Sequence, residues 1–167
     1  MRIFAALLLL AFIGSVYSGQ TATGRAYKVP EEAPVVTVHV SKRWKTQEHE
    51  EYIEAVSPDG NSHVLVLPVE GNKVTEATGE AMRHVRRRGG IMVKPESFKE
   101  EKVEIGTKEL PLLSWDATEH GRPLKIRCYL FSAQDGRRAI LFTWAPAEIK
   151  EENRQELSRI LKSVRTH

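Results

Sequence analysis

The chain has 167 residues, and 25 lysines and arginines stand against 22 aspartates and glutamates, which gives a formal net charge of +3. This length is enough for one domain with a real hydrophobic core, and so small a charge excess excludes the strongly basic class of nucleic-acid-binding proteins. The single cysteine, Cys128, excludes an intramolecular disulfide, so core packing alone must stabilise the fold.

The first eighteen residues have the layout of a secretory signal peptide. Arg2 supplies a positive start, residues 3–17 are almost continuously apolar, and Ser18 precedes Gly19 at a suitable cleavage point. This apolar run is shorter than the roughly 20 residues that span a bilayer, so cleavage is favoured over an uncleaved anchor. No cysteine lies near the cleavage point, so a lipid-modified N-terminus is excluded. We therefore expect a periplasmic or secreted protein with no stable membrane anchor after cleavage and no nucleic-acid partner.

The next segment, residues 19–34, is polar and rich in small residues, and it contains Pro30 and Pro34. Such a composition is typical of a flexible leader. We expect the folded part to be a single domain over residues 35–167.

The domain is expected to begin with strands. Residues 35–40 are mostly β-branched, which favours a first strand. Residues 51–56 and 64–69 are expected to form a hairpin, because proline, aspartate and glycine at residues 58–61 suit a tight turn. The second strand of this hairpin is apolar at nearly every position, as is typical of a strand covered on both faces.

A helix is expected over residues 73–88. Its apolar residues lie within one arc at 100° per residue, while Arg83, Arg86 and Arg87 lie on the far side. Gly89 and Gly90 follow, and glycine is the usual residue at a helix end.

The second half of the chain is rich in predicted strands and ends in a helix. The closing hairpin turns at residues 134–137 and has the clearest alternation of apolar and polar residues. A last helix is expected over residues 146–164, with acidic residues at its start and basic residues at its end. The expected strands cover residues 91–93, 103–105, 110–115, 124–131 and 139–144.

This order of elements indicates an α+β fold. The strands are linked mainly by hairpins, and two helices are too few for alternating parallel units. We expect one central antiparallel sheet with a helix packed on each face.

Three stretches of the chain resemble the PsbP-like superfamily. Residues 38–44, Val-His-Val-Ser-Lys-Arg-Trp, resemble its first strand, which continues into a tryptophan. Asp59-Gly60 and the strand over residues 64–69 resemble its second hairpin. The closing hairpin and a helix that ends in residues 161–164, Leu-Lys-Ser-Val, resemble its C-terminal part.

The resemblance implies a sandwich with a central antiparallel sheet between helices. It implies no catalytic residues, because the superfamily has no shared active site, and its members are mostly binding or assembly proteins. The parts specific to photosystem proteins are not matched, so a photosynthetic role does not follow.

Two groups of residues resemble metal ligands. The stretch over residues 47–51, Gln-Glu-His-Glu-Glu, is the densest, yet it has no second histidine at helical spacing, so a solvated loop is favoured. His39 and His63 lie on two predicted strands and would meet if those strands paired. His63 stands beside a turn, which favours an exposed side chain. We expect no metal and no cofactor.

Nucleophilic catalysis has no sequence signature here. Ser57 and Ser114 lack the motif of a nucleophile elbow, and Cys128 lies on the apolar face of a strand, as a buried thiol does. The tryptophans stand near strand ends, where packing is favoured over a ligand platform; they are Trp44, Trp115 and Trp144.

The densest basic group lies at the end of the first helix. It comprises Arg83, Arg86, Arg87 and Arg88, and it could attract an anionic polymer, a lipid headgroup or an acidic protein. The sequence thus favours an exported, non-enzymatic binding or assembly protein whose partner is a protein or ligand of the cell envelope. A module that binds anionic surfaces through this basic group, and an enzyme with an unrecognised site, are the alternatives.

Overall fold

The computed structural model describes residues 24–71 and 73–167, and the predicted signal peptide lies outside this part of the chain. The centre of the fold is a seven-stranded antiparallel sheet with the strand order β3-β4-β5-β9-β8-β7-β6. Its strands are β3 (Lys45–Glu48), β4 (Ile53–Val56), β5 (His63–Val69), β6 (Ile91–Ile105), β7 (Lys108–Glu119), β8 (Arg122–Ser132) and β9 (Arg138–Pro146).

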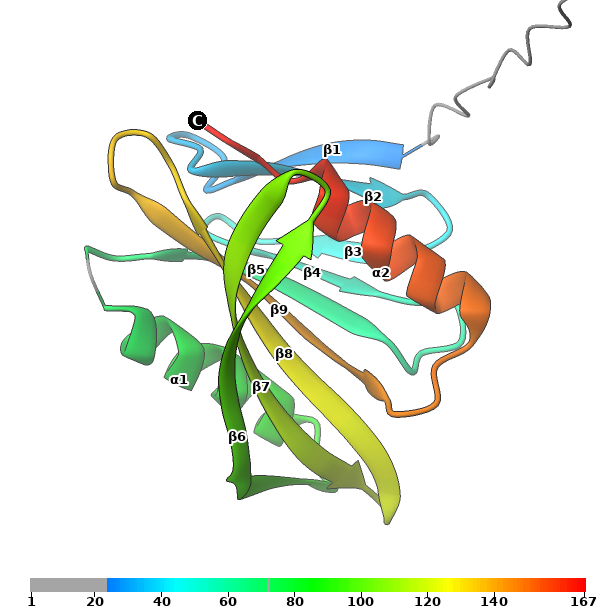
Figure 1. The fold of residues 1–167 in the computed structure, drawn as a ribbon. Helices are drawn as coiled ribbons and strands as arrows, with labels where there is room; N and C mark the ends of the chain where they lie inside the picture. Colours follow the sequence, from blue (N-terminus) through cyan, green and yellow to red (C-terminus); the bar gives the residue numbers. More distant parts are fainter. Residues whose placement is uncertain (1–23, 72) are drawn as a thin grey trace, which may run out of the picture.

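The two helices lie on opposite faces of this sheet (Figure 1). Helix α1 (Val74–Arg87) covers one face, and helix α2 (Glu151–Ser163) covers the other. Beside α2 lies a small antiparallel sheet with the order β1-β2-β10, formed by β1 (Gly24–Val29), β2 (Val36–Ser41) and β10 (Arg165–Thr166). The predicted fold class, α+β with a helix on each face of an antiparallel sheet, is confirmed.

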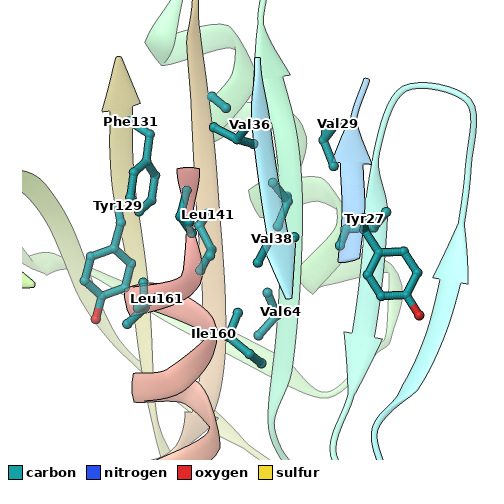
Figure 2. Close-up of a cluster of buried hydrophobic side chains, with 14 of the residues drawn as sticks. Tyr27, Val29, Val36, Val38, Val64, Tyr129, Phe131, Leu141, Ile160 and Leu161 are labelled. Carbon is teal, nitrogen blue, oxygen red and sulfur yellow. The ribbon is translucent and has the colours of Figure 1, made fainter. Parts of the chain in front are cut away.

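The face that carries α2 holds the larger of two hydrophobic cores. Figure 2 shows valines of β2, Leu141 of β9 and residues of α2 gathered between the layers. Ile160 of α2 is fully buried there, and Val38 of the small sheet is fully buried too. The small sheet and α2 therefore act together as one layer over the large sheet.

The second core lies beneath α1. The buried face of the helix presents Ala77, Ala81 and Val85 to Leu65 and Phe142 of the two central strands. Each of these helix positions is four residues from the next, so they lie on one side of the helix, as the sequence predicts. Strand β5 is buried at six of its seven residues, which confirms the prediction of a strand covered on both faces.

The prediction of a flexible leader over residues 19–34 is wrong for residues 24–29. Residues 24–29 form β1, which pairs with β2 in a register from Gly24↔Ser41 to Val29↔Val36. Tyr27 and Val29 are buried in the core, whereas their neighbours are exposed. The alternation of buried and exposed residues is not obvious in the sequence, because Arg25 and Lys28 stand among the apolar residues. The strand that pairs with this segment, β2, lies further along the chain.

Three other boundaries differ from the prediction. Helix α2 begins at Glu151 and not at residue 146, because Pro146 is the last residue of β9 and pairs with Leu124. Strand β6 is continuous over fifteen residues, whereas two short strands over residues 91–93 and 103–105 were predicted. Its pairing with β7 shifts register between Lys94 and Lys99. Strand β3 was not predicted, because its four residues are all polar and show no alternation with apolar ones.

The predicted turn at Asp59 also anchors α2. The Asp59 carboxylate accepts hydrogen bonds from the Ser57 hydroxyl at 2.6 Å and from the Asn153 amide of α2 at 3.1 Å. It also forms an ion pair with Lys150 at 3.2 Å. These hydrogen bonds, led by the one from Ser57, hold the pKa of Asp59 well below its usual range.

Replacing Ile160 tests the core beneath α2. We expect Ile160→Ala to lower the free energy of unfolding by about 2–5 kcal/mol, because the side chain is fully buried and its removal leaves a cavity. Gln155→Ala, on the exposed side of the same helix, should change it by less than about 0.5 kcal/mol. Urea unfolding measures both variants, and equal effects would show that the helix face is assigned wrongly.

Candidate functional site

An open groove of about 670 Å³ lies beside α1, at the end of β5. Five segments surround it. They are the β1–β2 turn, the β3–β4 turn, the end of β5 with the residues that follow it, α1 as far as Arg83, and Arg137 in the β8–β9 turn. Its volume lies within the roughly 300–1,000 Å³ typical of ligand sites.

The floor of the groove is apolar. Leu67 and Val69 of β5 and Ala77 of α1 belong to the core beneath α1. Val35 lines the groove too, but it belongs to the core on the other face of the sheet. The groove therefore lies where the two cores meet at one end of the central strands.

The rim of the groove is acidic. Six exposed glutamates line it, namely Glu32, Glu50, Glu51, Glu70, Glu76 and Glu80. They come from four of the five segments, so carboxylates stand on more than one side of the groove. We call these six residues and the apolar floor the acidic groove.

Most of the positive charge in the acidic groove is already neutralised. Lys73 forms an ion pair with Glu76 at 3.2 Å. Arg137 forms one with Asp135 at 2.6 Å, and its guanidinium also donates to the carbonyl oxygen of Ala33. Among the described residues the five remaining glutamates have no ion-pair partner, and the one further cation on the lining is Arg83.

An aromatic side chain stands at the same rim. Tyr52 is half-buried and lines the acidic groove next to Glu50 and Glu51. His49 stacks on its ring at 4.2 Å between centroids, and His84 of α1 meets it edge-on at 5.3 Å. These contacts fix the turn between β3 and β4 against α1.

The stretch of candidate metal ligands over residues 47–51 contributes to this rim. Within residues 24–71 and 73–167, no three histidine, cysteine, aspartate or glutamate side chains are grouped to hold a metal ion. Glu50 and Glu51 of the stretch line the acidic groove, while His49 packs on Tyr52.

The structure divides the four arginines of the predicted basic group among three surroundings. Arg83 lines the acidic groove. Arg88 pairs with Glu54 and lies over the Trp144 ring, 5.4 Å from its centroid. Arg86 and Arg87 are exposed at the end of α1.

The expectation of an exposed His63 is wrong. His63 is the first residue of β5, pairs with Trp144 in β9 and stacks on its indole ring at 4.7 Å, so only 5% of the residue is exposed. Burial, helped by the charge of Arg88, lowers the pKa of His63 to about 4. His39 lies on β2 in the small sheet, so the two histidines do not belong to neighbouring strands.

The other predictions about reactive and aromatic side chains agree with the structure. Cys128 is buried, and burial raises the pKa of its thiol to about 12, which confirms a thiol that packs as a small apolar group. Trp44 and Trp144 are buried in the two cores. Trp115 is half-buried and packs on the exposed ring of Phe98 at 5.3 Å.

No family model and no curated protein matches the chain, but solved structures share its fold. The cyanobacterial PsbP (CyanoP) of Synechocystis sp. PCC 6803 matches with a TM-score of 0.52 at 12% identity, over 93% of this chain and 99% of that one. A protein of Bacteroides thetaiotaomicron VPI-5482 matches with a TM-score of 0.58 at 12% identity, over 87% of this chain. This chain spans about half of that protein, with 49% covered.

The Ran-binding protein Mog1p of Saccharomyces cerevisiae matches with a TM-score of 0.46 at 13% identity, over 86% of this chain and 96% of that one. At 12% identity, the match to CyanoP shows the fold alone. The chain has a PsbP-like fold, and the resemblance predicted from its sequence is confirmed.

The buried His63 makes the stability of the protein depend on pH. Its folded pKa of about 4 lies below the ordinary value of 6.5, so the unfolded chain binds more protons between these values. The stability that the neutral His63 contributes to the folded state is fully present above pH 6.5. As the pH falls toward 4, the free energy of unfolding decreases by up to about 3 kcal/mol for this reason. In His63→Phe, which keeps a ring against Trp144, we expect this part of the pH dependence to disappear.

Urea unfolding between pH 7.5 and pH 4 measures the effect. His39→Phe is the matched control, because it removes an exposed histidine and should leave the pH dependence as in the wild type. If His63→Phe loses as much stability as the wild type over this range, carboxylates and not His63 cause the acid sensitivity.

Proposed function

We propose that this protein is an exported, non-enzymatic binding or assembly protein that holds a partner of the cell envelope in the acidic groove. The observation that carries the proposal is the groove itself, an open apolar floor below a rim of six glutamates, five of which lack ion-pair partners within the described residues. The PsbP-like fold supports it, because proteins of that superfamily are mostly binding or assembly proteins.

The lining of the groove favours binding over catalysis. Its described residues include carboxylates, Tyr52, Lys73 and Arg83, but no serine, cysteine or histidine. A serine or cysteine nucleophile activated by a histidine therefore has no candidate there. An apolar floor, in contrast, gains free energy when a partner displaces water from it.

Export is part of the proposal and rests on residues 1–18. No helix among the residues that the structure describes is long and apolar enough to cross a membrane. The positive start, the apolar run and the small residue before Gly19 support cleavage of a secretory signal.

Neutralising the rim tests the proposed function. We expect the triple variant Glu50→Gln/Glu51→Gln/Glu80→Gln, called the groove variant, to lose the partner that co-purifies with the wild type from the native envelope. The substitutions keep the size of the side chains and remove three charges at the groove. Quantitative mass spectrometry after a pull-down measures the loss, and the mass of the recovered chain should place its first residue at Gly19.

The matched control removes three charges from the exposed edge strand β6. This edge variant, Glu100→Gln/Glu101→Gln/Glu104→Gln, should retain the partner at the level of the wild type. Equal recovery with both variants would locate the partner elsewhere on the molecule, and a first residue other than Gly19 would contradict the proposed cleavage.

The exposed pair Arg86 and Arg87 supports a second candidate function, the binding of an anionic surface by the end of α1. We expect Arg86→Glu/Arg87→Glu to abolish retention on an anionic matrix at low salt, because charge attraction to a surface depends on such a local cluster. Lys42→Glu/Lys45→Glu makes the same change of net charge outside α1, in and before β3, and should be retained. Unchanged retention of the arginine variant would remove this candidate.

A further inference from the structure

Building on the proposed function, we propose that the acidic groove binds an extended peptide segment of a partner protein that carries both lysine or arginine and apolar side chains. Four features of the groove lead to this class of ligand. They are its charge, the distribution of that charge, its floor and the position of Arg83.

The charge of the groove calls for a cationic ligand. Once Lys73 and Arg137 are paired, five glutamates stand against Arg83 alone among the described lining residues. Like charges around one groove repel one another, and a bound cation adds an attractive interaction with each of them that offsets this repulsion. A cationic ligand is therefore attracted to the groove and also relieves repulsion within it.

The distribution of the carboxylates calls for more than one cation. Glu32 stands on the β1–β2 turn, Glu50 and Glu51 on the β3–β4 turn, Glu70 after β5 and Glu80 on α1. A single ammonium group can form ion pairs with only some of the carboxylates around such a rim. A segment with two or more separated basic side chains meets several sides of it.

The floor calls for apolar surface on the same ligand. Leu67, Val69 and Ala77 lie at the base of the groove, and Tyr52 lines it at the rim. Lysine and arginine bury their alkyl stems on apolar surface while their charges remain in water. The Tyr52 ring is also a suitable partner for a cation. Apolar side chains between the basic ones would cover the rest of the floor.

Arg83 favours a peptide over a simple polyamine. It is the one lining cation without an ion-pair partner among the described residues, and it repels a ligand cation at its own end of the groove. A guanidinium donates hydrogen bonds and needs acceptors. The carbonyl oxygens of a peptide supply them, whereas a polyamine has none.

A defined peptide tests this assignment. The probe is a fluorescent eight-residue peptide of alternating lysine and leucine, and its binding to the purified mature chain is measured by anisotropy at low salt. We expect it to bind, and we expect the groove variant to weaken binding at least tenfold while the edge variant changes it less than twofold. Affinity should also decrease as salt is raised, since exposed charges are screened.

Two further ligands define the outcomes that would overturn the assignment. A peptide of alternating glutamate and leucine should not bind, and spermidine should bind at least tenfold more weakly than the lysine peptide. Equal binding of spermidine would make the ligand a small polyamine, and equal binding of the glutamate peptide would show that charge does not select it. Equal weakening by both variants would reveal general attraction to a charged protein.

These outcomes are distinguishable from a failure of the proposed function. If the groove variant loses its co-purifying partner but the lysine peptide does not bind the wild type, the groove is the binding site and the basic-peptide assignment is wrong. If the groove variant keeps the partner, the proposed function itself is wrong, whatever the peptide does.

Discussion

Strands β5 and β9 pair at the centre of the large sheet and are buried on both faces, and the rest of the fold packs against them. Along β9, Ala139 and Leu141 enter the core beneath α2, while Ile140 and Phe142 enter the core beneath α1. A slip of one residue would exchange the two faces, so one register determines both cores. It also places the end of β5, and with it the floor of the groove, between α1 and the small sheet.

The elements that could be predicted are those whose sequence pattern lies within a single segment. The closing hairpin and α1 were predicted because alternation, turn residues and helical periodicity lie within each segment. Strand β1 was missed because its partner β2 lies beyond the prolines of a polar stretch. Burial of His63 was missed for a related reason, since it depends on the register with Trp144, some eighty residues later in the chain.

The acidic groove was not predicted, because each of its glutamates alone is typical of a solvated turn. Part of it could have been found, however. The hairpin of β4 and β5 was predicted, and in an antiparallel pair the start of one strand lies beside the end of the other. Glu51 before β4 and Glu70 after β5 must therefore stand at the same end of the sheet. The contributions of Glu32 and Glu80 depend on tertiary packing, which no local pattern reveals.

The stability of helix α1 explains the positions of some charged residues but not those of the glutamates around the groove. Glu76 near the start of the helix and Arg86 and Arg87 in its last turn complement the helix dipole, so they stabilise the helix whatever the protein binds. The dipole gives no reason for Glu50, Glu51 and Glu70 to gather on other segments around the same groove. Like charges within about 10 Å of one another raise the free energy of the folded state. Folding gains nothing from this arrangement, and the cationic partner that we propose would offset the repulsion when it binds.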